Sequence, residues 1–166
     1  MALRSRRFLE LVTEAATAAL GGEAPERRQR ASMAQLYFGD RNQHYEVWLR
    51  PAAGLVELGL HFEGPQEENR RRVAVVAEAM PLVSPALGPS VEVEEWTESW
   101  TRVHETLPLL PLDERFAAAL GARLALYVSV LEPVVRPLGP MPAPPRHEHT
   151  GRSRWRGRRR TAAAKP

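Results

Sequence analysis

Hydrophobic and polar residues alternate over residues 44–64, HYEVWLRPAAGLVELGLHFEG, in two runs separated by residues 51–54. A period of two is typical of half-buried β-strands, so this stretch predicts a β-hairpin. When Arg50 is paired with Leu55, the apolar side chains of both strands fall on one face of the hairpin. The other face then carries polar and aromatic side chains, namely His44, Glu46, Trp48, Arg50, Glu57 and His61.

Three other stretches repeat their apolar residues at the helical period of about 3.6. The first covers residues 3–20. The second begins at Pro65 and is ended or kinked by Pro81, because proline lacks the N–H that a helix interior needs. The third begins after Asp113, a residue type that caps helix N-termini, and continues to Pro133. These periods predict three amphipathic helices.

Short apolar runs predict three further strands. Residues 33–38 form one, and residues 91–96 and 100–107 form a second hairpin that sets Trp96 beside Trp100. By strand parity this hairpin adds further residues to the polar face of the sheet, namely Glu92, Glu94, Arg102 and His104. The order helix, three strands, helix, two strands, helix predicts the α+β class. We expect an antiparallel sheet of about five strands with helices packed on its apolar face.

The chain is long enough for one domain with a core, having 166 residues of which 43% are hydrophobic. We expect this domain to cover residues 1–136, with residues 22–32 as an exposed polar loop. Residues 137–166 are rich in proline and then in arginine, which predicts a linker followed by a disordered basic tail. The charge is divided in the same way, since residues 1–145 have a net charge of −4 and residues 146–166 a net charge of +7.

Two residue types exclude several kinds of active site. The chain has no cysteine, and Lys165 in the tail is its single lysine. The domain therefore lacks the residue that thiolate nucleophiles, cysteine-bound zinc, phosphate-binding loops, kinase sites and Schiff-base sites require. No G-x-S-x-G sequence occurs either. We expect no cofactor, and an enzyme that uses the His and Glu residues of the sheet face is the third of our functional alternatives.

A metal site is the one cofactor-like arrangement that the hairpin suggests. His44 and His61, with Glu46 or Glu63, can meet across neighbouring strands, and two imidazoles with a carboxylate are a ligand set for transition metals. Their spacing matches no metal-binding motif, and ordinary strand residues explain it more often. The sequence therefore predicts no metal site.

The succession of elements resembles that of the small secretion-chaperone-like α+β fold. The resemblance lies in element order alone and is not carried by motif residues. In that fold, dimers of such domains bind an extended partner polypeptide, so the resemblance implies a dimeric protein-binding domain.

The three tryptophans of the polar sheet face allow two interpretations. Aromatic side chains exposed together mark contact surfaces, which favours a site for a protein partner or for a second copy in a homodimer. Alternatively, the N-terminal helix or residues 22–32 fold over the rings and bury them. Our leading hypothesis is a non-enzymatic binding module of the chaperone or adaptor kind, with candidate partner-binding residues Trp48, Trp96, Trp100, Arg50, Arg102 and His61.

The basic tail gives the alternative function, that of a nucleic-acid-binding accessory protein. Dense positive charge neutralises phosphates, and a tryptophan ring stacks on a base, so such binding would weaken steeply with salt. A solvated tail without a function explains the same composition equally well. The candidate residues are Arg152, Arg154, Trp155, Arg156, Arg158, Arg159 and Arg160.

The N-terminus begins with arginines, as a signal peptide does. Glu10 and Glu14, however, interrupt the stretch that would have to be its apolar core. No apolar run approaches the roughly 20 residues of a membrane span. We therefore expect a cytoplasmic protein that does not insert into a membrane.

Overall fold

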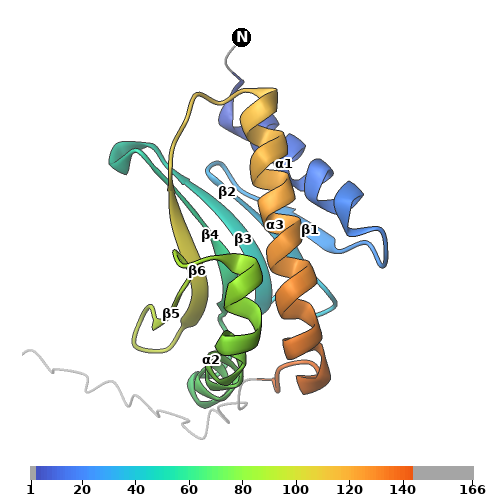
Figure 1. Ribbon diagram of the computed structural model, residues 1–166, viewed down its shortest axis with the longest axis vertical. Helices are drawn as coiled ribbons and strands as arrows, with labels where there is room; N and C mark the ends of the chain where they lie inside the picture. Colours follow the sequence, from blue (N-terminus) through green and yellow to red (C-terminus); the bar gives the residue numbers. More distant parts are fainter. Residues whose placement is uncertain (1–2, 144–166) are drawn as a thin grey trace, which may run out of the picture.

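The computed structural model describes residues 3–143, which form three α-helices on one side of a six-stranded sheet (Figure 1). The helices are α1 (Ser5–Leu20), α2 (Gln66–Leu87) and α3 (Glu114–Val135). The strands are β1 (Glu26–Gln29), β2 (Met33–Tyr37), β3 (Gln43–Arg50), β4 (Leu55–Phe62), β5 (Glu92–Glu95) and β6 (Thr101–Pro108). All neighbouring strands are antiparallel, in the order β1-β2-β3-β4-β6-β5. The predicted α+β class and the helix-covered antiparallel sheet are confirmed.

The central hairpin of β3 and β4 has the predicted register. Arg50 pairs with Leu55, and the pairing continues along both strands through Tyr45 opposite Leu60. A short 3-10 turn, Pro51–Ala53, joins the strands, and it ends at Gly54 with a positive φ of 67° that favours glycine. This register directs the apolar side chains of both strands toward the helices.

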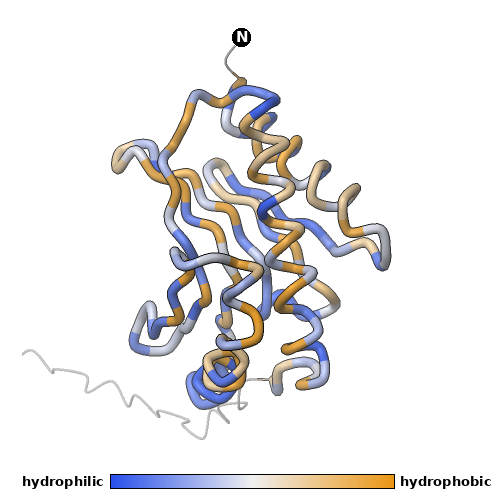
Figure 2. Tube along the Cα trace, in the orientation of Figure 1, coloured by the Kyte–Doolittle hydropathy of each residue, from blue (hydrophilic) through white to orange (hydrophobic). Residues whose placement is uncertain are grey.

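The core lies between the sheet and the helices. In Figure 2, hydrophobic stretches of α3 lie over hydrophobic positions of the central strands. Helix α3 is long and apolar enough to cross a membrane by length and composition, but half of its apolar window is buried inside the domain. At Gly121 it approaches α1 closely, since a Cβ there would lie 2.6 Å from the Cβ of Ala15. Core packing therefore explains the apolar character of α3.

Helix α2 continues through both of its prolines. It includes Pro81 and Pro85 and ends at Leu87, before Gly88. Figure 1 shows the helix bent between its first and last turns, as expected where proline removes a backbone hydrogen bond. Of the two predicted effects of Pro81, an end or a kink, the structure has the kink.

Residues 22–32 differ from the prediction, because they are not wholly a loop. Glu26–Gln29 form the edge strand β1, which pairs with β2 and makes the sixth strand. Arg27 donates a hydrogen bond to Thr13 Oγ1 (3.1 Å), and Gln29 donates one to Arg6 O (2.8 Å), so α1 holds this strand. The sequence ERRQ has no apolar alternation, and cross-strand pairing alone makes it a strand.

The packed part of the chain extends past the predicted boundary at residue 136. The guanidinium of Arg72, 1% exposed, donates to Gly139 O (2.8 Å) and to Gln43 Oε1 (2.6 Å). Met141 is 8% exposed, and its N–H donates to Asp40 Oδ2 (2.6 Å). These polar contacts attach residues 139–141 to the domain. The segment is rich in proline and has few apolar residues, so its packing could not be predicted from a hydrophobic pattern.

Candidate functional site

The sheet has one face that no helix covers among residues 3–143, and we call it the open face. Helices α1, α2 and α3 all pack on the opposite face, and α1 contacts α3 most extensively (Figure 1). Residues 22–32 extend the sheet at its edge as part of β1 and do not fold over the rings. The alternative in which either segment buries the open face is therefore wrong for the part of the chain that the structure describes.

Three tryptophans meet on the open face, and we call Trp48, Trp96 and Trp100 the tryptophan cluster. The ring centroids of Trp48 and Trp96 are 6.4 Å apart, and those of Trp96 and Trp100 are 6.0 Å apart. The predicted pairing of Trp96 with Trp100 is confirmed. Trp100 is 38% exposed, which makes it one of the few large apolar side chains on the surface of the described residues. The cluster therefore presents aromatic surface to solvent.

The loop between β5 and β6 carries two of these rings, and α2 holds it in place. The N–H of Trp96 donates to the carbonyl of Trp100 (2.9 Å), and the N–H of Trp100 donates to Thr97 Oγ1 (2.9 Å). Asn69, fully buried at the start of α2, donates to Ser99 O (2.8 Å). Because these bonds fix the backbone on both sides of the turn, the two rings are preorganised.

Arginines pack against the rings and share a buried carboxylate. The Arg50 and Arg102 guanidiniums lie 5.1 Å from the Trp48 ring centroid and 4.8 Å from the Trp96 ring centroid. Such cation–π contacts favour a fixed ring orientation. Both arginines pair with Glu57, which is 5% exposed, and Arg102 Nη1 lies 2.8 Å from Glu57 Oε2. The predicted candidates Arg50 and Arg102 thus lie at the site and support the rings.

Gly59 allows β4 and β6 to lie close together beneath this network. A Cβ at Gly59 would lie 2.3 Å from Val103 O and 2.7 Å from the Cβ of His104. His104 is therefore pressed against the sheet, and Nδ1 of its ring has no hydrogen-bond partner among the residues that the structure describes. Burial, assisted by the charge of Arg102, lowers the pKa of His104 below its ordinary value.

A pair of stacked histidines forms the floor of the site next to Trp96. His44 and His61 are cross-strand partners with ring centroids 5.5 Å apart and an interplanar angle of 21°. The Trp96 ring meets the His61 ring edge-on at 5.4 Å. The predicted candidate His61 is thus covered by the tryptophan cluster and is only 2% exposed. A partner would contact the cluster and not this ring.

The charges around His44 are balanced by neighbouring carboxylates. Burial by itself would lower the pKa of His44. A hydrogen bond with Glu46 and the negative charge of Glu63 have the larger effect, so the pKa lies above its ordinary value. Burial by itself would raise the pKa of Glu46. Contacts with His44, His61 and Gln35 have the larger effect, so the pKa lies below its ordinary value. Both residues are therefore held toward their charged forms.

A cavity of about 360 Å³ opens beside the tryptophan cluster. Trp96 and Trp100 line one side, and Arg28, Arg30 and Arg41 line another; we call these three the arginine rim. None of the three forms an ion pair within residues 3–143, so their charge is free to meet a ligand. Arg28 and Arg30 belong to the stretch that was predicted to be an exposed loop. The pairing of β1 with β2 brings them here, and the residue pattern of β1 does not indicate a strand.

Other cavities lie elsewhere on the surface. One of about 650 Å³ lies between α1 and β1, and no aromatic residue lines it. Specific ligand sites combine apolar surface with a few placed polar groups. Two cavities of about 460 Å³ beside Phe38 have both, as the cavity on the open face does, but neither adjoins the tryptophan cluster. We therefore take the open-face cavity with the tryptophan cluster as the candidate site.

Two groups of side chains on the open face could hold a metal ion. The ligand atoms of His44, His61 and Glu63 lie within 4.8 Å of one another, as do those of Glu92, Glu94 and His104. No metal site is predicted from the sequence, because the spacing of these residues matches no metal-binding motif. Strand pairing, and not spacing along the chain, brings these atoms together.

The tail residues proposed for nucleic-acid binding, between residues 152 and 160, lie outside the described residues. Their role stays a prediction.

No protein-family model and no curated protein matches the chain. Among solved structures, the chain is similar to one in the crystal structure of the ExsC–ExsE complex, with 16% sequence identity. The match covers 81% of this chain and 96% of that one, with a TM-score of 0.38. A likeness at this level does not indicate a function.

Proposed function

We propose that the protein is a protein-binding module that uses the open face of its sheet. Its partner is a segment of another protein that carries an apolar side chain next to acidic side chains. The observation that carries this proposal is the tryptophan cluster, preorganised at the mouth of a cavity on the face that no helix within residues 3–143 covers. Tryptophan and arginine are the residue types that contribute most to protein interfaces.

The chemistry of the partner follows from the two sides of the cavity. The rings of Trp96 and Trp100 offer an apolar contact, and the unpaired guanidiniums of the arginine rim offer bidentate contacts to carboxylates. A cavity of about 360 Å³ holds one or two side chains. An acidic segment with a single large apolar residue therefore fits both its size and its charge.

The proposal is tested with short synthetic peptides in which one Leu or Phe is flanked by Asp and Glu. Binding is measured by fluorescence anisotropy at low and physiological salt, against peptides in which Lys replaces every acidic residue. We expect the acidic peptides to bind and the basic ones not to bind. In the protein, Trp96→Ala with Trp100→Ala should weaken binding at least about tenfold, because the apolar contact is lost.

Leu82→Ala is the matched control, since Leu82 is an apolar side chain 84% exposed on α2, away from the open face. It should bind as the unsubstituted protein does. Equal binding of acidic and basic peptides, or full binding by the double tryptophan variant, would contradict the proposal.

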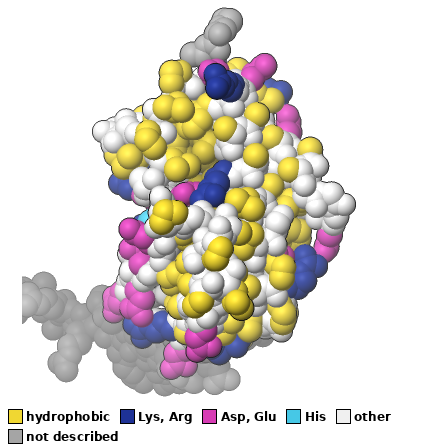
Figure 3. All heavy atoms as spheres, in the orientation of Figure 1, with side chains coloured by type: hydrophobic (Ala, Val, Ile, Leu, Met, Phe, Trp, Pro, Cys, Tyr) yellow, Lys and Arg dark blue, Asp and Glu magenta, His cyan; other side chains and the backbone are white. Residues whose placement is uncertain are grey.

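A second copy of this chain is the competing occupant of the open face. Acidic side chains gather near β5 in the view of Figure 3, and Glu92, Glu95 and Glu98 are exposed there. Analytical ultracentrifugation over a concentration series distinguishes the two. A dimer that the double tryptophan variant abolishes would identify the second copy as the partner.

A further inference from the structure

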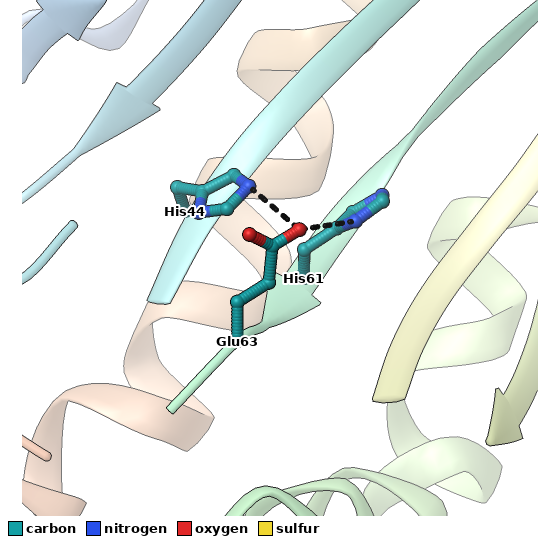
Figure 4. A group of neighbouring side chains, drawn as sticks. All are labelled: His44, His61 and Glu63. Carbon is teal, nitrogen blue, oxygen red and sulfur yellow. Dashed lines mark ion pairs between the residues drawn. The ribbon is translucent and has the colours of Figure 1, made fainter. Parts of the chain in front are cut away.

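Figure 4 shows the side chains of His44, His61 and Glu63, whose potential ligand atoms converge on the open face. Glu63 Oε1 lies 3.9 Å from His44 Nε2 and 3.8 Å from His61 Nδ1. The two histidines face one another across β3 and β4, and Glu63 follows directly after β4. The two rings and the carboxylate thus come from neighbouring backbone positions that the hairpin fixes.

These distances suit a bridging ion better than direct hydrogen bonds. A hydrogen bond between a ring nitrogen and a carboxylate oxygen spans about 2.7–3.2 Å, so gaps of 3.8 and 3.9 Å are too long. Two ligands that are each about 2.0–2.2 Å from a tetrahedral ion lie roughly 3.3–3.6 Å apart. A rotation of the Glu63 side chain, which is 23% exposed, would shorten its two gaps, and a tilt of the two rings would adjust the separation of their nitrogens, which is at most 4.8 Å.

Nδ1 of His61 is a buried polar atom without a partner. The side chain is 3% exposed, and Nδ1 has no hydrogen bond to any residue in the described range 3–143. A buried nitrogen in this state costs free energy unless something binds it. The atom on its open side is Glu63 Oε1, so a cation between the two would satisfy both.

His44 is already oriented for such a role. Its Nδ1 lies 2.7 Å from the carbonyl oxygen of Arg41, to which it donates a hydrogen bond as a metal-bound imidazole commonly does. A metal ion binds the neutral ring, whose lone pair is then on Nε2, so the ion would replace the proton that the Glu46 and Glu63 carboxylates favour on that nitrogen. The Gln35 amide lies 3.0 Å from the same nitrogen, and it would keep its 2.7 Å bond to Glu46 if an ion took its place.

We propose that His44, His61 and Glu63 form a binding site for one divalent transition metal ion, of which Zn²⁺ is the probe. Imidazole nitrogen with carboxylate oxygen is the ligand set that this class of ion prefers, whereas Mg²⁺ and Ca²⁺ prefer oxygen alone. His44 and Glu63 also line the cavity of the open face, so the remaining coordination position opens toward that cavity. The site stands independently of the proposed function.

The second group, Glu92, Glu94 and His104, is the weaker candidate. The carboxylate of Glu94 is already engaged by Arg102, whose Nη2 lies 2.5 Å from its Oε1. The side chain of Glu92 is 74% exposed. A cation there would compete with a guanidinium that is fixed in place, so this group serves as a control.

The test measures Zn²⁺ affinity of the full chain by competition with a chromogenic chelator. We expect one ion per chain. Glu63→Gln keeps the shape of the side chain and removes its charge. It should weaken Zn²⁺ binding at least roughly 10- to 100-fold, because substitutions of residues that merely hydrogen-bond to a metal ligand already have effects of that size. His61→Ala should weaken it at least as much, with circular dichroism confirming that the variant is folded.

Co²⁺ gives a readout of position, because it quenches fluorescence of nearby rings. The Trp96 ring lies 5.4 Å from the His61 ring, so Co²⁺ should quench tryptophan emission in the unsubstituted protein, and Glu63→Gln should need about 10- to 100-fold more Co²⁺ for the same quenching. Two control variants should bind Zn²⁺ as the unsubstituted protein does. One is Glu94→Gln, and the other replaces the two histidines of the C-terminal tail, His147→Ala with His149→Ala. No binding at micromolar Zn²⁺, unchanged binding by Glu63→Gln, or loss of binding in either control would overturn the proposal.

Discussion

The two faces of the sheet bury side chains of opposite character. On the helix-covered face, the side chains of Val47, Leu58 and Leu60 are at most 1% exposed and pack into an apolar core. On the open face, Glu46 and His61 are at most 3% exposed although no described helix lies over them. Cross-strand neighbours and the tryptophan cluster bury them instead. The same two strands thus build a core on one side and a polar network on the other.

Both sides of the sheet contain buried polar groups, and these groups have different partners. On the helix-covered side, the Tyr45 hydroxyl donates to Glu132 Oε2 at 2.8 Å. Burial, with the charge of Glu132, raises the pKa of that tyrosine well above its usual range. The open face leaves ring nitrogens of His61 and His104 without hydrogen bonds among the described residues. The Tyr127 hydroxyl on α3 also lacks a hydrogen bond among the described residues, so what distinguishes the open face is that its unpaired ring nitrogens lie beside the partly exposed tryptophan cluster.

The largest effect should come from the helix-covered face. Leu60→Ala removes a fully buried side chain opposite Tyr45, leaves a cavity and should lower the free energy of unfolding by about 3 kcal/mol in urea titrations. Leu82→Ala, at an exposed position, should change it by less than about 0.5 kcal/mol. A loss below about 1 kcal/mol for Leu60→Ala would contradict our assignment of the core to this face.

A smaller effect is expected from the open face. Glu57→Gln removes the charge that Arg50 and Arg102 share and should lower the free energy of unfolding by roughly 1–3 kcal/mol. The matched control is Glu92→Gln, on the same face but 74% exposed, which should have almost no effect. If both variants unfold at the same urea concentration, the buried network contributes little and the two faces differ less than we argue.

The smallest effect is a dependence on pH. Because the folded pKa of His104 is lowered, the unfolded chain takes up a proton near its ordinary pKa of about 6.5 while the folded chain does not. Stability should therefore fall as the pH falls from about 6.5 toward the folded pKa. We expect the stability of the unsubstituted protein relative to His104→Gln to decrease between pH 8 and pH 5, measured in urea with a chelator present. A relative stability that rises over this range would show that the folded pKa is raised instead.

The hairpin of β3 and β4 shows what could be predicted about the site. Alternation alone set Tyr45 opposite Leu60 and placed Trp48 and His61 on the other face, because a shift of one residue would have turned an apolar row to solvent. The pairing of Trp96 with Trp100 followed from the same argument. The arginine rim could not be predicted, since Arg28 reaches the cavity through a strand whose residues have no apolar pattern.

The sequence by itself determined the spacing of apolar residues. That spacing in turn determined the helices, the register of the β3–β4 hairpin, and which side of these strands is apolar and which is polar. These are local properties, since each depends on residues within a few positions of one another. Only the tertiary structure decided that the N-terminal helix joins the other two on the apolar face, that β1 completes the sheet, and that His44, His61 and Glu63 converge. Those outcomes depend on packing between segments distant along the chain, where many arrangements satisfy the same local pattern and contact energies select one.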